Sequence, residues 1–135
     1  MADNALAKKL LIKPGHRVLV LNAPDGDAAL LGDLPEGASM EASPQGTYDV
    51  VQAFAHNRAD VDRLTPVALR ALRPGGVLWF CYPKGSSKVK TDITRDKGWD
   101  AMWSEGWVVI AQVSLDDTWS AGRFRPLGDV KSSKG

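Results

Sequence analysis

The sequence has little that could supply covalent or metal cross-links. Its 135 residues include one cysteine, Cys81, which excludes an internal disulfide and any zinc site built from several cysteines. No apolar run is long enough to cross a bilayer. The N-terminus lacks the basic-then-apolar pattern of a signal peptide, so we expect a cytoplasmic protein. Charge of one sign is not in excess either: 17 basic residues against 16 acidic ones argue against a dedicated membrane or nucleic-acid binder.

What is present is the composition of a folded globular domain. Hydrophobic residues make up 44% of the chain and charged residues 24%, which excludes a disordered or low-complexity protein. A chain of this length buries about two-thirds of its unfolded surface, enough for a core without disulfides. We expect a single domain over residues 1–127 and a mobile tail over residues 128–135.

Strand-like and helix-like periodicities alternate along the chain. Three apolar runs predict buried strands at residues 17–22, 48–55 and 77–82. A short strand is also expected at residues 38–42. The predicted helices cover residues 4–12, residues 27–34, residues 58–72, and a segment from Thr91 or Asp92 to about residue 105. Thr65 followed by Pro66 resembles a helix start, which predicts two consecutive helices or a kink within residues 58–72.

The last two predicted strands differ from the others in how they are joined. Residues 107–115 and 119–125 are separated by a turn too short for a crossover, so they should form an antiparallel hairpin. Elsewhere the alternation of strands and helices predicts a parallel sheet with helices on its faces. The expected fold class is therefore α/β: a three-layer, Rossmann-like, mostly parallel sheet that ends in an antiparallel hairpin.

Two segments stand out: Tyr-Asp-Val-Val at residues 48–51, and Leu-Arg-Pro-Gly-Gly at residues 72–76, which leads into the next strand. Together they resemble class I S-adenosylmethionine-dependent methyltransferases. The terminal hairpin resembles the reversed final strand of that family. Residues 82–92 and 117–120 more closely resemble a small group of uncharacterised bacterial proteins regarded as cut-down methyltransferases. A βαβ unit takes about 30 residues or more, so this chain can hold only a reduced form of the seven-stranded sheet. The missing unit is expected between Ala42 and Tyr48.

The resemblance breaks at the loop that binds the cofactor in this family. There an acidic residue and three glycines follow the first strand, and the glycines let the backbone approach the cofactor. Aligned with that pattern, this chain has Val20 at the acidic position. Its residues at the three glycine positions are Asn22, Pro24 and Gly26. Pro24 has no N–H to offer and a fixed φ, so it impairs a site made of backbone groups.

Acidic residues near this loop have opposite implications. Asp25 and Asp27 would satisfy the N-terminus of the next helix themselves and repel the carboxylate of the cofactor. Glu41 lies near the end of the second strand, where the ribose-binding acid of the family is found. The resemblance thus implies Asn22, Gly26 and Glu41 as cofactor contacts. Because one acid does not restore the loop, we expect no bound cofactor, with S-adenosylmethionine as the alternative.

A polar loop with three lysines follows the third strong strand. Its sequence, Lys-Gly-Ser-Ser-Lys-Val-Lys-Thr, spans residues 84–91 and lacks the Walker pattern. Ammonium groups, hydroxyls and helix N–H groups can together hold a phosphate or carboxylate. The alternative is a solvated surface loop. The candidate anion ligands are Lys84, Ser86, Ser87, Lys88, Lys90 and Thr91, with His56 beside them.

Other residues with chemical potential give weaker signals. His56 can act as a general base, but a lone histidine after a strand is more often structural. Cys81 lies in an apolar strand, where a thiol behaves as a small hydrophobic group. We assign no catalytic residue and no metal ligand. Trp99 and Trp103 are four residues apart, which indicates one helix face packed on the sheet or, alternatively, an exposed aromatic patch.

Three functional hypotheses follow. The leading one is a methyltransferase-like domain without methyl transfer that acts as a binding or interaction module. The first alternative is an active S-adenosylmethionine-dependent methyltransferase with a divergent cofactor loop, in which Glu41 holds the ribose and His56 lies near the methyl acceptor. The second is a phosphate- or nucleotide-binding protein that uses the loop at residues 84–91. The partners left open are a small anionic ligand and a second copy of the chain, which could cover the edge of the shortened sheet.

Overall fold

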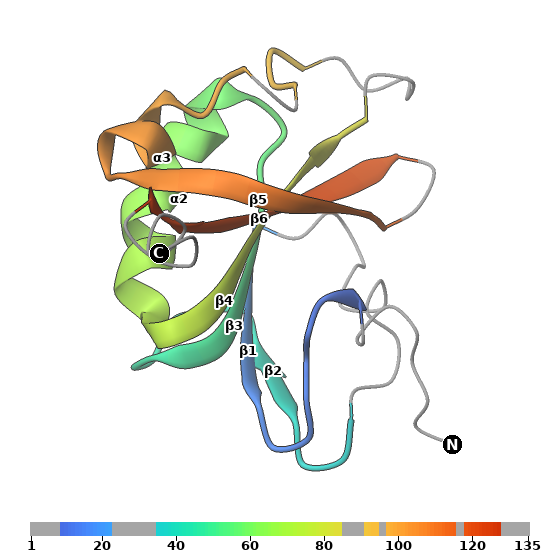
Figure 1. The fold of residues 1–135 in the computed structure, drawn as a ribbon. Coiled ribbons are helices and arrows are strands. Elements are labelled where there is room, and N and C mark those ends of the chain that lie inside the picture. Colours follow the sequence, from blue (N-terminus) through green and yellow to red (C-terminus); the bar gives the residue numbers. More distant parts are fainter. Residues whose placement is uncertain (1–8, 23–34, 85–90, 95–96, 116–117, 128–135) are drawn as a thin grey trace, which may run out of the picture.

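The computed structural model describes residues 9–22, 35–84, 91–94, 97–115 and 118–127 (Figure 1). The helix expected at residues 27–34, most of the one at residues 4–12, and the tail lie outside these ranges. The described elements are β1 (Arg17–Leu21), β2 (Ser39–Glu41), β3 (Tyr48–Phe54), α2 (Arg58–Ala71), β4 (Leu72–Pro83), α3 (Asp100–Ser104), β5 (Trp107–Ser114) and β6 (Trp119–Pro126).

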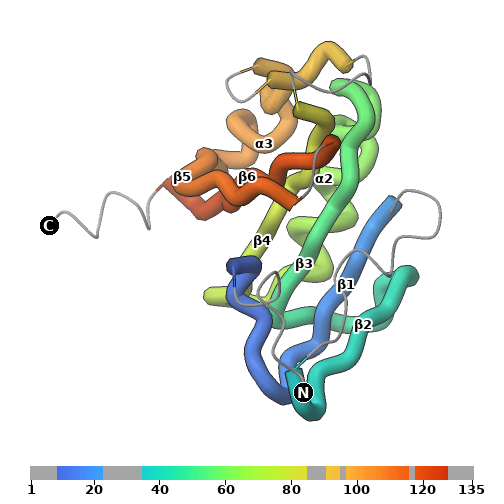
Figure 2. Tube along the Cα trace, turned by 90° about the vertical axis from the view of Figure 1, so that its right-hand side faces the viewer, coloured from blue at the N-terminus to red at the C-terminus, as the bar shows by residue number. Residues whose placement is uncertain are grey.

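The strands form one mixed sheet in the order β2-β1-β3-β4-β6-β5 (Figure 2). The first four strands of that order are parallel, and β6 is antiparallel to both β4 and β5. The predicted α/β sheet with a terminal antiparallel hairpin is confirmed. Only residues 42–47 separate β2 from β3. The sheet therefore has six strands among the described residues, and the connection from β2 to β3 contains no helix.

Both faces of the sheet are covered. Successive residues of a strand point to opposite sides, so each strand contributes side chains to both faces. Helices α2 and α3 cover one face (Figure 1). The core on that side includes Leu19, Val51, Phe80, Trp99, Met102 and Phe124. The core on the other side includes Leu10, Val18, Val50, Trp79, Cys81 and Ala121. The continuous apolar runs in the sequence are explained by burial on both sides.

The N-terminal segment is attached to the second face by one buried hydrogen bond. The indole Nε1–H of Trp79 donates to the backbone oxygen of Leu10 at 2.9 Å. Leu10 is fully buried and Ile12 nearly so. Residues just before β1 thus complete the core on the face that α2 and α3 leave open.

Helix α2 continues through Pro66, so the predicted break into two helices is wrong. Pro66 cannot donate to the carbonyl of Asp62, but both residues are exposed and water can bond that oxygen. Thr65 is not a cap, because its hydroxyl donates to the carbonyl of Val61 at 2.7 Å. The helix begins instead at Asn57, whose side-chain oxygen accepts from the Asp60 N–H at 2.9 Å.

Helix α3 is much shorter than predicted, because the residues before it form turns. The hydroxyl oxygen of Thr91 accepts from the N–H of Ile93, and the backbones of Thr94 and Lys97 bond each other. Gly98 has a φ of +97°, which an α-helix does not accommodate. The helix expected from residue 91 or 92 therefore begins only at Asp100.

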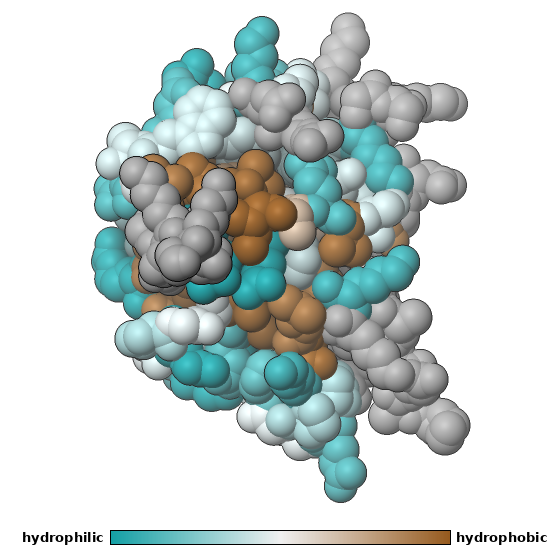
Figure 3. Space-filling view, viewed as in Figure 1, coloured by the Kyte–Doolittle hydropathy of each residue, from teal (hydrophilic) through white to brown (hydrophobic). Residues whose placement is uncertain are grey.

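The two helix-spaced tryptophans do not share one environment. Trp99 is 1% exposed, and its ring packs against Phe80, Tyr82 and Phe124. Trp103 is 42% exposed. On the face seen in Figure 3, hydrophobic side chains gather near the middle and hydrophilic ones surround them. The expectation that a tryptophan packs the helix against the sheet thus holds for Trp99 alone.

Candidate functional site

The carboxyl ends of β1 and β3 mark the place where ligands bind in open α/β sheets. From β1 the chain passes to β2 on one side, and from β3 it passes to β4 on the other. Such a switch in direction leaves a crevice beyond the strand ends. Asn22 follows β1 directly, and His56 and Asn57 follow β3. The candidate site is built from these residues and the first turn of α2.

Asn22 bridges the two strand ends. Its φ is 57°, in the left-handed region that glycine prefers and asparagine tolerates. Its side-chain Nδ2 donates to the backbone oxygen of Phe54 at 2.8 Å and reaches Asp60 Oδ2 at 3.4 Å. The carboxamide is therefore held across the switch point between β1 and β3.

Asp60 organises the other polar groups at this edge. Its carboxylate accepts from the His56 backbone N–H at 2.9 Å and from the Arg63 guanidinium at 3.1 Å. Burial raises the pKa of Asp60, but these hydrogen bonds and the charge of Arg63 together lower that pKa by more, so it lies below its usual value. Asp60 is thus a carboxylate that is ionised near neutral pH and already has several donors.

His56 is the exposed member of this group. Its Nδ1 lies 3.4 Å from Asp60 Oδ2, and its side chain is 42% exposed. Its ring meets that of Trp119 edge to face, with centroids 5.1 Å apart. A carboxylate beside Nδ1 orients an imidazole, so Nε2 is the nitrogen that a ligand would meet.

Sequence reasoning found no titratable partner for His56, and Asp60 is that partner. The signal was available in the spacing, because an aspartate four residues after a histidine lies in the first turn of the following helix. The contact of Trp119 with His56 joins segments that are far apart in the sequence. That contact had no local signal.

Glu41 does not join the residues at the carboxyl edge. Strand β2 pairs with only the first three residues of β1, and Leu19 lies opposite Glu41. The Glu41 carboxylate accepts from the Tyr48 hydroxyl at 2.5 Å and pairs with the Arg17 guanidinium at 3.4 Å. Arg17 and Tyr48 begin β1 and β3, so this acid is bonded to residues at the amino ends of its neighbours.

Two residues of the lysine loop are described, and they lie at its ends. Lys84 Nζ is 2.6 Å from the Ser114 hydroxyl, and the Lys84 N–H donates to the carbonyl of Thr118. The Thr91 hydroxyl accepts from a backbone N–H two residues on. Gly26 and the remaining candidate anion ligands lie outside the described residues: Ser86, Ser87, Lys88 and Lys90.

Cys81 and the acidic residues form no reactive or metal-binding cluster in the part of the chain that is described. Burial raises the pKa of Cys81 to about 12. Gln52 Nε2 lies 3.4 Å from its sulfur. No group of three or more His, Cys, Asp or Glu side chains there is placed to hold a metal ion. Among the same residues, no helix has the length and hydropathy needed to span a membrane.

Comparisons with known proteins agree on the fold. No family model matches the sequence, and no curated protein matches it. Similar solved structures include DhpI in its SAH complex, with a TM-score of 0.60 and 14% identity over 90% of this chain and 82% of DhpI. Fibrillarin from Aeropyrum pernix with natively bound S-adenosyl-L-methionine has a TM-score of 0.60 and 14% identity, over 84% of this chain and 68% of fibrillarin.

A third similar structure is the ribosomal protein L11 methylase from Lactobacillus delbrueckii subsp. bulgaricus. Its TM-score is 0.57 at 12% identity, over 88% of this chain and 73% of the methylase. At sequence identities this low, the comparisons establish similarity of fold alone. The chain has the fold of the class I S-adenosylmethionine-dependent methyltransferases, in a form reduced to six described strands.

Proposed function

We propose that this protein is a methyltransferase-fold domain without methyl transfer, which acts as a binding module through the carboxyl edge of its sheet. The observation that carries the proposal is Asn22. This residue takes the place of the first cofactor-loop glycine and keeps a left-handed backbone, with a φ of 57°. The turn is therefore retained, but a side chain has been added where the fold needs open backbone.

The hydrogen bonds of Asn22 make that side chain a fixed obstacle. Its Nδ2 donates to the Phe54 carbonyl at 2.8 Å, so the carboxamide lies across the crevice between β1 and β3. A ligand entering the crevice would have to displace this bond and leave the carbonyl without its donor. Pro24, two residues later in the sequence, removes a further backbone donor from the loop.

The position of Glu41 supports the same proposal. An acid that binds the ribose of a nucleoside must be free to accept from its hydroxyl groups. The carboxylate of Glu41 instead accepts from Tyr48 and pairs with Arg17. The residues present therefore do not fit S-adenosylmethionine.

A second candidate is an active methyltransferase, and one observation favours it. His56 is exposed at the carboxyl edge and has Asp60 beside its Nδ1. A histidine oriented by a carboxylate can accept a proton from a methyl acceptor. DhpI and fibrillarin, which have the same fold, are described as complexes with SAH and S-adenosyl-L-methionine.

Calorimetric titration with S-adenosylmethionine and S-adenosylhomocysteine distinguishes the two candidates. We expect no heat of binding at about 1 mM of either compound, which corresponds to roughly −4 kcal/mol. A dissociation constant below about 100 μM, or roughly −5.5 kcal/mol, would overturn the proposal in favour of the enzyme.

The obstruction itself is tested by the double substitution Asn22→Gly and Pro24→Gly. If these two residues block an otherwise intact site, the variant should bind S-adenosylhomocysteine at least about tenfold more tightly than the natural chain, a gain of roughly 1.4 kcal/mol. His16→Gly is the matched control, since His16 lies before β1 at the opposite edge of the sheet. Equal affinity in all three proteins would show that Asn22 is not the obstacle.

A further inference from the structure

Residues 9–12 lie against the second face of the sheet, just before β1. In Figure 1 this segment and the turn after it arc beside β1 on the side away from α2 and α3. Leu10 is fully buried and Ile12 is 4% exposed, and both belong to the core cluster that contains Trp79. The segment therefore completes the core of this face, although it belongs to no strand of the sheet.

The turn that follows this segment is attached to the residues before β2. The Gly15 N–H donates to the carbonyl of Glu36 at 3.0 Å, and the carbonyl of His16 accepts from the Ser39 N–H at 3.0 Å. These backbone bonds hold both ends of the turn's second half in place. The turn at residues 13–16 therefore gives the preceding segment a fixed base.

Leu11 has a strained backbone between two buried neighbours. Its φ is 65°, in the left-handed region. A residue with a Cβ disfavours this region, because the Cβ approaches the following carbonyl oxygen. Such strain persists only where the surrounding structure holds it. Here the burial of Leu10 and Ile12, and the hydrogen bond from Trp79 to the Leu10 carbonyl, outweigh the strain and keep the segment closed.

Gln52 is a second unfavourable feature of this face. It lies opposite Trp79 on the neighbouring strand, so the two side chains point to the same side of the sheet. Gln52 is 1% exposed, and its Oε1 has no hydrogen-bond partner among the described residues. A buried carbonyl oxygen without a donor costs free energy, which contact with water recovers. Leu11 and Gln52 thus both reduce the free-energy cost of opening this face.

We propose that residues 9–12 form a strap that opens and closes while the rest of the fold stays intact, and so controls access to the second face of the sheet. Opening moves the strap about the turn at residues 13–16, breaks the hydrogen bond from Trp79 to Leu10, and lets Leu11 leave the left-handed region. The strands stay paired, because their pairing does not involve the strap. The proposal is independent of the carboxyl-edge function, because it uses none of the same residues.

Hydrogen exchange of two indole N–H groups, followed by nuclear magnetic resonance, tests this device. The Trp79 N–H exchanges with solvent only after its bond to Leu10 opens. Trp99 is the matched control, because its Nε1–H also donates to a backbone carbonyl, that of Thr94 at 2.8 Å. Both tryptophans are 1% exposed, but Trp99 belongs to the core on the opposite face. Local opening of the strap should therefore affect Trp79 alone.

Leu11→Gly should slow exchange of the Trp79 indole by about tenfold, or roughly 1.4 kcal/mol, because glycine adopts a left-handed backbone without strain. Exchange of the Trp99 indole should stay within about twofold. Leu11→Ala is the matched variant: it also removes the leucine side chain but keeps a Cβ, so it should not slow the exchange. Equal slowing of both indoles by Leu11→Gly, or no slowing at Trp79, would overturn the proposal.

The urea dependence of exchange in the natural chain provides a test that needs no variant. Opening of a four-residue strap exposes little surface, so exchange of the Trp79 indole should accelerate only weakly as urea is added. The backbone N–H of Val51, which is fully buried in the central strand β3, should respond with the full slope of global unfolding. Equal slopes for Trp79 and Val51 would show that the strap opens only when the whole chain unfolds, contrary to the proposal.

Discussion

Arg17 connects three parts of the chain through one side chain. Its guanidinium donates to the carbonyls of Gln45 and Thr47 at 2.9 Å and pairs with Glu41. It also lies over the Tyr48 ring, 4.3 Å from the centroid. These contacts hold the short connection from β2 to β3 against the start of β1. The energetics of this connection therefore depend on individual polar residues.

The Glu41 carboxylate should make stability depend on acid. The hydrogen bond from Tyr48, with help from Arg17, holds the pKa of Glu41 below its ordinary value. A carboxyl group with a lowered folded-state pKa stabilises the fold above its unfolded pKa, and this contribution is lost as pH falls through the folded value. We expect Glu41→Gln to lower the urea midpoint at about pH 7 and to lose less stability than the natural chain down to about pH 3.

The matched control for this acid dependence is Glu105→Gln, at an exposed glutamate beyond α3. It should follow the natural chain at every pH. The Glu41→Gln and natural curves should converge as pH falls, because protonation of Glu41 removes from the natural chain the charge that the variant already lacks. Parallel curves would contradict the assignment to Glu41.

Cys81 should be inert in the folded protein. Burial raises the pKa of its thiol to about 12, whereas its ordinary value is 9.0. At about pH 8.5 this shift alone lowers the thiolate fraction, and hence the rate of alkylation, by roughly a thousandfold. We expect iodoacetamide to modify the thiol readily in urea and very slowly in its absence. Comparable rates in the two conditions would contradict the buried environment.

At the scale of elements, α2 contains a proline that it tolerates at a cost. Pro66 lies in the helix interior and leaves the carbonyl of Asp62 without its helical donor. Pro66→Ala should raise the free energy of unfolding by about 1–3 kcal/mol, since the N–H is restored on an exposed face. Arg70→Ala, also at an exposed position of α2, is the control and should change stability by only a few tenths of a kcal/mol. A lower urea midpoint for Pro66→Ala would contradict this account.

Strands buried on both faces were predictable from the sequence, whereas the start of α3 and the continuity of α2 were not. β1, β3 and the second half of β4 contain apolar runs that are buried on both faces, so these runs identified the strands. Helix α3 failed because Thr91 and Thr94 satisfy backbone groups in turns, which composition does not reveal. The predicted break at Pro66 was wrong because the free-energy cost of a proline within a helix depends on whether the unbonded carbonyl is exposed to solvent. The sequence does not show that exposure.

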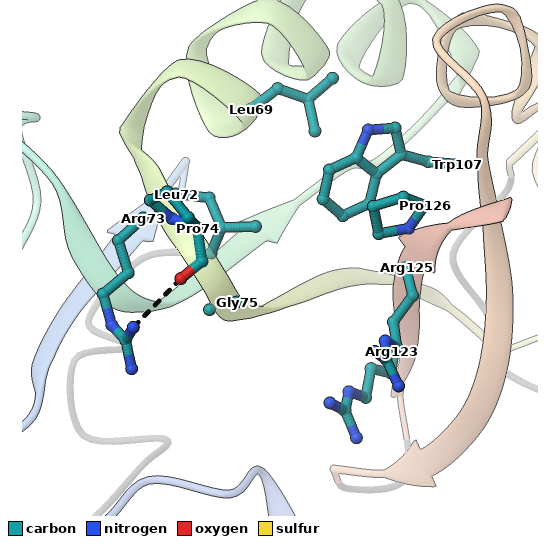
Figure 4. Close-up of a pocket in the computed structure, with 10 residues that line it drawn as sticks. Leu69, Leu72, Arg73, Pro74, Gly75, Trp107, Arg123, Arg125 and Pro126 are labelled. Carbon is teal, nitrogen blue, oxygen red and sulfur yellow. Dashed lines mark hydrogen bonds between the residues drawn. The ribbon is translucent and has the colours of Figure 1, made fainter. Parts of the chain in front are cut away.

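The candidate site divides in the same way. That Asn22 and His56 meet at one edge follows from parallel topology, so the sequence predicted their grouping. Glu41 was expected in that group, but its strand ends after three residues. The hollow between β4 and β6, which Arg123 and Arg125 help to line (Figure 4), had no sequence signal, because it depends on where the pairing of these strands stops.

At the scale of the molecule, the outer strands of the sheet determine whether copies can pair. Strand β2 is three residues long, and β5 has a register irregularity between Val109 and Ala111. Short or bulged edges offer few aligned backbone groups to a second chain. We therefore expect a monomer by light scattering at both about 10 μM and about 200 μM, although Ile110 is 40% exposed on β5. A doubled mass at the higher concentration would show that an edge is used.

The short connection from β2 to β3 has a practical consequence for protein engineering. The residues that flank it, Glu41 and Tyr48, are joined by a hydrogen bond, so the two ends of the loop are close together. A loop with neighbouring ends can be lengthened at a cost that grows only slowly with the number of residues. Residues 42–47 are therefore a suitable site for inserting additional residues. An epitope or a reporter domain placed between Ser43 and Pro44 would extend the molecule at the edge of the sheet opposite its carboxyl-edge site.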